Sequence, residues 1–345
     1  MTMFGIKDIA KLAGTSPATV SRILNDPEHR CSSPELRDRV LSIAKENNYS
    51  LNSDARRLRK GASFSIQQKK VCCFLARTQN NISKGDQFFS NLARIIEQEA
   101  LKRGCKLGFS FNASQYEELL NNASIDPEGT GLIILGRPRN SEMIPKLEQL
   151  YRYTVFVGLQ QFSDSIDQVL SDARGAASTA LEYLYDLGHR SIAYIGETKR
   201  EQRYNGYIEF LEKKNIRISE DLIIEIPYQN YDSGYKGAYE LFSHNVRPSA
   251  VFCANDITAF GVINAFRELN LRIPEDISVI SVDNVDLAQF TKPMLTTVQI
   301  PKEELGHFAV DLLLSKMSGR LQSHMTISLP CQLVIRDSCR RLTER

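Results

Sequence analysis

The stretch "IKDIAKLAGTSPATVSRILN", residues 6–25, contains two helix-forming patterns separated by a turn. In residues 6–13 the apolar positions recur at i, i+3, i+4 and i+7, which is the spacing of one helix face. These positions are Ile6, Ile9, Ala10 and Ala13. Gly14 can adopt the left-handed backbone conformation that ends a helix. The pattern therefore predicts a helix over residues 6–13 and a turn directly after it.

The second half of this stretch predicts another helix, which begins at residue 17. Ser16 is a residue type that caps helix N-termini, and Pro17 fits the first helical turn, where its missing N–H costs nothing. Val20 and either Ile23 or Leu24 then face inward. The remaining side chains stay outside, and they are Ala18, Thr19, Ser21, Arg22 and Asn25.

A third helix is expected after Ser33, again with a proline, Pro34, at its first position. Its buried stripe consists of Leu36, Val40, Ile43 and Ala44. Three short helices of this kind can close a small core, so residues 1–51 are predicted to form an all-α head domain.

Two helices joined by a short turn, with exposed polar side chains on the second, are typical of a helix-turn-helix, whose second helix enters the major groove of DNA. An ordinary helical hairpin that packs on another part of a protein is the alternative that this pattern leaves open. Charge favours DNA, because residues 1–61 carry 11 Lys and Arg against 7 Asp and Glu, a net charge of +4, while the rest of the chain carries −2.

Residues 52–61, "NSDARRLRKG", predict one more short helix, capped at Asn52 or Ser53 and stopped by Gly61. Such a short helix is only marginally stable alone in water. The following "GASFSIQQKK" is polar and lacks helical periodicity, which is typical of a linker. We therefore expect a hinge helix and linker over residues 52–70.

From residue 71 onward, short apolar runs alternate with amphipathic helices, beginning with "VCCFLA", "FFSNLARIIEQEALKRG", "KLGFSF" and "GLIILG". This alternation predicts a parallel sheet covered by helices on both faces. The same rhythm restarts after "TVFVG", residues 154–158, and continues through "SIAYIG", "SAVFCAN" and "ISVISVD". We therefore expect two doubly wound α/β lobes with a ligand cleft near the carboxyl ends of their strands.

Composition and motifs exclude several classes of protein. The seven cysteines are never spaced C-x-x-C and the five histidines show no metal-ligand spacing, so we expect reduced thiols, no metal and no cofactor. There is no run of about 18 apolar residues and no signal-peptide pattern at the start, so we expect a cytoplasmic protein. The phosphate-loop, nucleophile-elbow and dinucleotide-binding motifs are absent from the sequence, which argues against an enzyme.

The head stretch, together with "ENNYSLNSDARRLRKG" at residues 46–61, resembles the lactose-repressor/galactose-repressor (LacI/GalR) family of bacterial transcription regulators. Within that family, the A-T-V-S-R-x-L-N-D run is most similar to the evolved-β-galactosidase repressor branch. "YLYDLGHRSIAYIG", "AVFCANDITAFGVINAFRELNLRIPEDISVISVDN" and "KPMLTTVQI" resemble the family's sugar-binding core in the same order and spacing. The resemblance implies a core like the type I periplasmic binding proteins, with a first lobe of residues 71–163 completed by 292–325 and a second lobe of residues 164–291 completed by 326–345.

The resemblance also implies a function. We expect a sequence-specific transcriptional repressor of a sugar-utilisation operon, of the galactose or β-galactoside type, that binds pseudo-palindromic operator DNA as a homodimer. A small carbohydrate bound between the lobes would relieve repression. Corepression by a sugar or by a phosphocarrier protein, as in the catabolite-control branch, stays open. A plain sugar-binding protein is the alternative from another class, but it would not need a helix-turn-helix.

Carried over residue by residue, the resemblance places Pro17, Ala18 and Arg22 at the family's base-reading positions. Of these, only Arg22 has a strong hydrogen-bonding group, which can bind guanine O6 and N7 together. Leu58 matches the leucine that the family inserts into the minor groove. The other residues expected at the DNA are Ser16, Thr19, Ser21 and Asn25 in the second helix and Asn52, Ala55 and Arg59 in the hinge.

In the core, the resemblance places Arg203, Asn255 and Asp283 at positions that hydrogen-bond sugar hydroxyls, for which guanidinium, amide and carboxylate groups are suited. Asp256 is expected to cap the helix that follows it. Because the chain has no tryptophan, an aromatic platform under a sugar ring must be Phe or Tyr. Phe88 is the first candidate, and the alternatives are Phe89, Tyr204 and Tyr207.

Overall fold

The computed structural model describes residues 6–25, 33–46, 69–76, 87–113, 115–117, 125–138, 140, 142–199, 201–244 and 246–342. The chain divides into two compact units, Met1–Ile66 and Gln67–Arg345. The first unit is the head and the second is the core.

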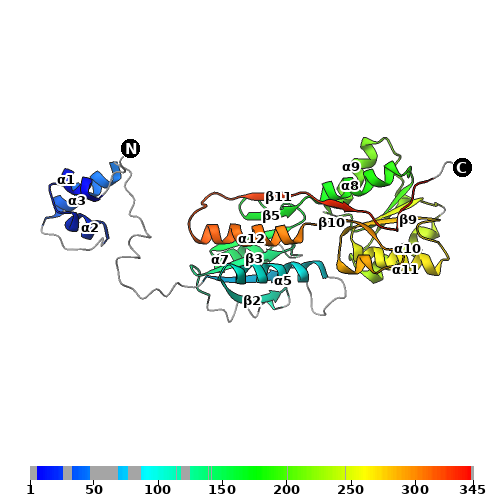
Figure 1. Ribbon diagram of the computed structural model, residues 1–345, viewed down its shortest axis with the longest axis horizontal. Coiled ribbons are helices and arrows are strands. Elements are labelled where there is room, and N and C mark those ends of the chain that lie inside the picture. Colours follow the sequence, from blue (N-terminus) through cyan, green and yellow to red (C-terminus); the bar gives the residue numbers. More distant parts are fainter. Residues whose placement is uncertain are drawn as a thin grey trace. The chain divides into compact units, whose positions relative to one another are not determined.

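Within its described residues the head forms helices at the positions predicted from the sequence (Figure 1): α1 (Ile6–Ala13), α2 (Pro17–Asn25) and α3 (Pro34–Glu46). Gly14 has a φ of 69° and ends α1, and Ser16 Oγ caps α2 by accepting a hydrogen bond from the Thr19 N–H at 3.1 Å. The buried side chains between the helices are Ile9, Ala10, Ala13, Val20, Ile23, Val40 and Ala44. All three helices contribute to this core, so each depends on the others.

The first lobe of the core is built on a parallel sheet with the strand order β11-β5-β4-β3-β1-β2 (Figure 1). Its strands are β1 (Lys70–Leu75), β2 (Lys106–Asn112), β3 (Thr130–Leu135), β4 (Tyr153–Gly158), β5 (Asp167–Ser171) and β11 (Thr326–Leu329). Its helices are α5 (Gln87–Lys102), α7 (Met143–Leu150) and α12 (Lys302–Met317). On β3, Ile133 and Leu135 pack on the side of α5 and α12, while Leu132 and Ile134 pack on the side of α7. Helices on both faces explain why this strand is buried along its whole length.

The second lobe repeats this architecture with the strand order β12-β10-β9-β8-β6-β7. Its strands are β6 (Ile192–Gly196), β7 (Ile223–Glu225), β8 (Ala250–Cys253), β9 (Ser278–Asp283), β10 (Thr296–Gln299) and β12 (Gln332–Val334). Its helices are α8 (Ala173–Asp186), α9 (Gln202–Lys213), α10 (Tyr231–Ser243) and α11 (Asp256–Glu268), with short 3-10 helices η1 (Glu220–Leu222) and η2 (Asp286–Gln289). The two lobes confirm the predicted α/β core. The second sheet is mixed, however, because β12 pairs antiparallel with β10.

The chain passes between the lobes later than the resemblance implied. Residues 167–171 were expected in the second lobe, but β5 pairs with β4 of the first sheet. Residues 296–299 were expected in the first lobe, but β10 pairs with β9 of the second. Residues 326–329 were expected in the second lobe, but β11 pairs with β5 of the first. The physical reason is that an apolar run shows where a strand lies in the sequence but not which other strand it pairs with.

Two further features of the described residues bear on function class. None of their helices has the length and apolar character needed to cross a membrane. Among the same residues, no group of three or more His, Cys, Asp and Glu side chains is arranged to hold a metal ion. The cysteines that the structure describes are free thiols, namely Cys72, Cys73, Cys105, Cys253, Cys331 and Cys339.

Candidate functional site

One face of α2 presents the residues expected to contact DNA. Ser16, Pro17, Ala18 and Arg22 are exposed, and Thr19 and Ser21 are half-buried. Asn25 is the last residue of the helix. Arg22 is therefore available to a partner, as base reading requires. The hinge residues expected at DNA, Asn52, Ala55, Leu58 and Arg59, lie outside the described residues.

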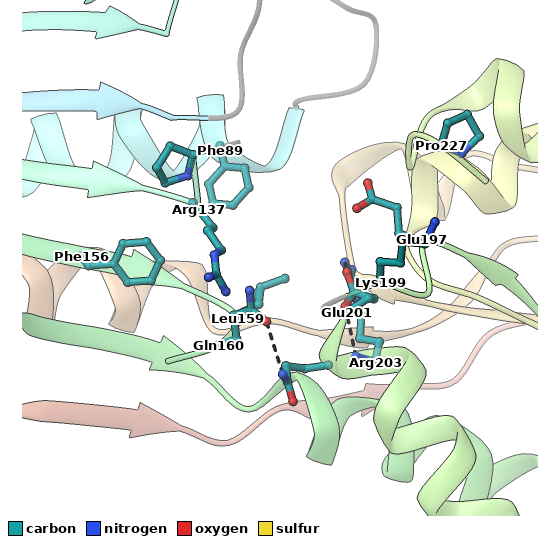
Figure 2. A pocket seen from close by; sticks show the side chains of 13 residues that line it. Phe89, Arg137, Phe156, Leu159, Gln160, Glu197, Lys199, Glu201, Arg203 and Pro227 are labelled. Carbon is teal, nitrogen blue, oxygen red and sulfur yellow. Dashed lines mark hydrogen bonds and ion pairs between the residues drawn. The ribbon is translucent and has the colours of Figure 1, made fainter. Parts of the chain in front are cut away.

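A second candidate site is a cavity of ≈ 340 Å³ in the core, lined from both lobes (Figure 2). Arg137 follows β3 and Gln160 follows β4 in the first lobe, while Glu197 follows β6 and Pro227 follows β7 in the second. All four lie just beyond the carboxyl ends of parallel strands, which is where open α/β sheets bind ligands. The position of the cavity agrees with the cleft predicted from the strand pattern.

Arg203 is the centre of the polar wall on the second lobe. It is 2% exposed, and its Nε donates to Glu201 Oε1 at 2.8 Å while Nη2 donates to Glu201 Oε2 at 3.0 Å. Nη2 also donates to Gln229 Oε1 and Nη1 to the Ala254 carbonyl, both at 2.6 Å. These contacts fix the plane of the guanidinium before any ligand arrives.

Glu201 stays ionised beside this arginine. Burial alone would raise the pKa of its carboxyl, but the charge and hydrogen bonds of Arg203 outweigh burial and lower the pKa to about 2. Gln229 Nε2 adds a hydrogen bond to Glu201 Oε2 at 2.8 Å. Figure 2 shows Glu201 and Arg203 at the edge of the cavity with their contact drawn as a dashed line.

Asp283, at the end of β9, has a strained backbone and lies beside Arg203, but it is not among the residues that line the cavity. Its φ of 120° is a conformation that side-chain-bearing residues seldom adopt, and Lys302 Nζ donates to its carbonyl at 2.8 Å. Its Oδ1 is buried without a hydrogen-bond partner among the described residues and lies 3.9 Å from Arg203 Nη1. Burial raises the pKa of this carboxyl to about 7, which the Arg203 charge only partly offsets. This unpartnered oxygen is an acceptor for a group that binds Arg203, which does line the cavity.

Asn255, also expected at the ligand, is not among the residues that line the cavity, and its side chain is engaged by the protein. Its Oδ1 accepts from the Thr258 N–H at 2.9 Å, which makes Asn255 the cap of α11, and its Nδ2 donates to the Gln229 carbonyl at 3.2 Å. The expectation that Asp256 caps this helix is wrong. Asp256 is buried, and its carboxylate accepts hydrogen bonds from the Ser281 hydroxyl on β9 and the Thr297 hydroxyl on β10. Its side chain is therefore directed at these strands and not at the N–H groups of the helix.

On the first lobe, the aromatic side chain at the cavity is Phe89 and not the expected Phe88. Successive helical residues point about 100° apart, so only one of the pair can face the cleft. Phe88 packs edge-on against Phe89, with Lys302 Nζ 5.8 Å from the centre of its ring. Tyr204 and Tyr207 stack with Tyr194 inside the second lobe and do not line the cavity.

A hydrogen bond crosses the cavity between the lobes. Gln202 Nε2, at the start of α9, donates to Gln160 Oε1, after β4, at 3.4 Å (Figure 2). Phe156 also lines the first-lobe side. The site thus has aromatic side chains and Arg137 on the first-lobe wall, a network of charged side chains on the second-lobe wall, and one polar contact that joins the two.

Comparisons with known proteins identify the families that the head and the core resemble. Residues 5–52 match the group described as bacterial regulatory proteins of the lacI family, and residues 181–339 match a periplasmic binding protein-like domain. The transcriptional repressor PurR of Histophilus somni (strain 2336) is 30% identical over 349 residues, covering 99% of this chain and 100% of PurR. The chain belongs to the lacI family. It is therefore a DNA-binding transcriptional repressor with an effector-binding core.

Two further relatives place the chain within this family. The transcriptional repressor MelR of Bacillus subtilis (strain 168) is 31% identical over 350 residues, covering 98% of both chains. The crystal structure of a LacI family transcriptional regulator from Enterococcus faecium with bound ribose has a TM-score of 0.68 and 26% identity, covering 80% of this chain and 100% of that one. These similarities confirm the family and the fold without selecting one branch of the family.

Sequence reasoning missed several residues of the cavity. Glu201 lies two positions before Arg203 in "EQR". A carboxylate at this spacing can contact the arginine, so the spacing is the signal from which Glu201 could have been predicted. Gln229 comes from the loop after β7, far away in sequence, and no local pattern marks it. Gln160 and Gln202 meet only because the two lobes face each other.

Proposed function

We propose that this lacI-family repressor regulates a sugar-utilisation operon and that its effector is a small carbohydrate bound in the cavity of the core. The observation that carries the proposal is the pairing of walls around that cavity. Phe89 and Phe156 are the aromatic residues that line it, Arg203 lines it as a donor, and Asp283, 3.9 Å from Arg203, adds an unpartnered acceptor beside the lining. A sugar has both an apolar C–H face and hydroxyls that donate and accept, so it matches both walls.

Relatives support the carbohydrate class. The Enterococcus faecium regulator is described with bound ribose. Galactose and β-galactosides are the first candidates for this chain, on the resemblance of its A-T-V-S-R-x-L-N-D run to the evolved-β-galactosidase repressor branch.

On the DNA side, we propose that two chains form a homodimer whose heads bind the two halves of a pseudo-palindromic operator. Arg22 reads a base, while Thr19, Ser21 and Asn25 contact phosphates, which set register without reading sequence. Leu58 of the hinge enters the minor groove. The effector acts as an inducer if it binds more tightly to the form with a weaker grip on DNA, by about 1 to 3 kcal/mol for ordinary coupling.

The decisive experiment measures operator affinity of the full-length protein across a panel of galactosides, glucosides and phosphorylated sugars. The operator is first isolated by selection from random duplexes. A sugar that raises the melting temperature and weakens operator binding, with no product formed, supports the proposal. A sugar that strengthens operator binding makes the effector a corepressor. Steady conversion of a sugar would make the protein an enzyme, and a panel with no response would contradict the carbohydrate class.

A further inference from the structure

The guanidinium of Arg203 has little hydrogen-bonding capacity left for a ligand. An arginine carries five N–H donors. Two of these N–H groups go to Glu201, one goes to Gln229 and one goes to the Ala254 carbonyl. Among contacts within the described chain, a single Nη1–H remains, and the Asp283 Oδ1 atom lies 3.9 Å from that nitrogen, too far for a direct hydrogen bond.

Glu201 occupies the edge with which arginine binds anions. Carboxylates and phosphates are bound by arginine through two parallel N–H···O bonds. Glu201 already forms this pair, through the 2.8 Å contact with Nε and the 3.0 Å contact with Nη2. Both side chains are buried, so solvent does not compete for the contact. To bind this edge of Arg203, a carboxylate or phosphate of an effector would have to displace Glu201; the other cationic side chains that line the cavity are Arg137 and Lys199.

The groups that remain suit one hydroxyl. Its oxygen can accept the remaining Nη1–H of Arg203, and its hydrogen can be donated to Asp283 Oδ1, which lacks a partner among the described residues. A hydroxyl both donates and accepts, whereas an ionised carboxylate only accepts and cannot donate to the ionised form of Asp283. Arg203 and Asp283 together therefore distinguish a hydroxyl from a carboxylate.

We propose that Glu201 is a positioning residue that selects a neutral, hydroxyl-bearing effector over an anionic one by keeping the anion-binding edge of Arg203 occupied. The inference rests on the proposed function, in which the effector binds against Arg203. It goes beyond that function because it assigns the discrimination between neutral and anionic effectors to Glu201, which need not contact the effector itself.

The test compares matched pairs of ligands on the full-length protein. The pairs are D-galactose and D-galacturonate, D-glucose and D-glucuronate, and D-ribose and ribose 5-phosphate. The measured quantity is the ratio of the Kd of the anionic member to the Kd of the neutral member. For the wild type we expect a ratio of about ten or more, since like charges brought together are strongly unfavourable.

Two variants separate charge from position. Glu201→Gln removes the charge, and Glu201→Asp keeps the charge but is too short to reach both Nε and Nη2 in the same way. Both should lower the ratio to about three or less, because the arginine edge becomes available. General destabilisation would weaken both members of a pair and leave the ratio unchanged. The matched control is Glu182→Gln, which removes an exposed carboxylate 2.7 Å from Lys214 Nζ, a pair outside the cavity lining, and should keep the wild-type ratio.

The outcomes distinguish this inference from the proposed function. A wild type that binds the anionic members as tightly as the neutral ones overturns the inference, and so does a Glu201→Asp variant that keeps the wild-type ratio. If Glu201→Gln does not fold, as judged by its melting curve, Glu201→Asp decides alone. If no saccharide of either kind binds the wild type, the proposed function itself fails and this inference fails with it.

Discussion

At the scale of single residues, the exposed side chains of α2 differ in what they can recognise. Pro17 and Ala18 offer only apolar contact, for example to thymine methyl groups, whereas Arg22 carries a guanidinium that matches the guanine edge in the major groove. In the proposed complex with DNA, base recognition by this helix would therefore depend unequally on its residues, and we expect most of it to come from Arg22.

Replacing Arg22 with Ala should cost about 1 to 3 kcal/mol of operator affinity and relax the base preference at one operator position. The measurement is a repeated selection from random duplexes with the wild type and the variant. Arg39→Ala, at an exposed position on α3, is the control and should leave the base preference unchanged. An Arg22→Ala protein that selects the same operator as the wild type would contradict the assignment of α2 as the base-reading helix.

Asp283 predicts a pH dependence whose sign follows from its burial. Burial raises the pKa of this carboxyl in the folded protein to about 7, while an unfolded chain has a value of about 3.9. The folded state therefore holds a proton that the unfolded state has lost, and stability from this group decreases as pH rises from about 4 to about 7. Asp283→Asn removes the titration, so its melting temperature should rise relative to the wild type over that interval.

The measurement is the melting temperature of the effector-free wild type and of effector-free Asp283→Asn across this pH range. The difference between the two melting temperatures removes the contribution of groups that titrate in both proteins. Parallel melting-temperature curves for the two proteins would rule out a titrating Asp283. In the wild type, sugar affinity should increase with pH, since a hydroxyl donates to the carboxylate form.

At the scale of elements, the head was predictable and the pairing of core strands was not. The three helices of the head were predicted because caps, proline positions and apolar spacing are local signals, as at Ser16 and Pro34. The core strands were recognised as apolar runs, but the sheet joined by β5 or β10 depends on contacts with distant segments. The same limit explains Gln229, which reaches Arg203 from another loop, and Phe89, whose direction depends on how α5 is rotated.

The turn between α1 and α2 gives a prediction at this scale. Gly14 has a φ of 69°, and a Cβ there would meet no heavy atom within 4 Å, so the cost of a side chain lies in the backbone alone. Gly14→Ala should destabilise the head by about 1 kcal/mol. Gly14→Asn should be milder, because asparagine tolerates this conformation. Hydrogen exchange of the α1 and α2 amides in the full-length protein measures both, and equal protection in Gly14→Ala and the wild type would refute the prediction.

At the scale of the whole molecule, the repressor must link the occupancy of the core cavity to the grip of the head on DNA. The lobes are joined by chain passages after β5, β10 and β11, and by the hydrogen bond from Gln202 to Gln160. A ligand that contacts both walls of the cavity favours whichever arrangement of the lobes brings those walls together.

The proposed hinge gives the prediction at this scale. Leu58→Ala should reduce bending of the operator more than it reduces binding to random duplex, because an apolar wedge supports the bent duplex and contributes little to phosphate contact. Fluorescence energy transfer between the ends of a labelled operator measures the bend. Ser63→Ala in the linker is the matched control. A Leu58→Ala protein that bends the operator like the wild type removes the wedge from the proposal.

The late passages between the lobes also affect how the protein is made. The first sheet gains its edge strand β11 only when residue 329 has left the ribosome, and the second sheet gains β12 only after residue 334. Among the described residues, the core of the head is formed by α1, α2 and α3 alone, and α3 ends at residue 46. A nonsense codon near the 3′ end of the gene would therefore release a chain with a complete head and a core that lacks its last strands. We expect such truncated chains to interfere with the full-length protein, so these alleles should not be silent.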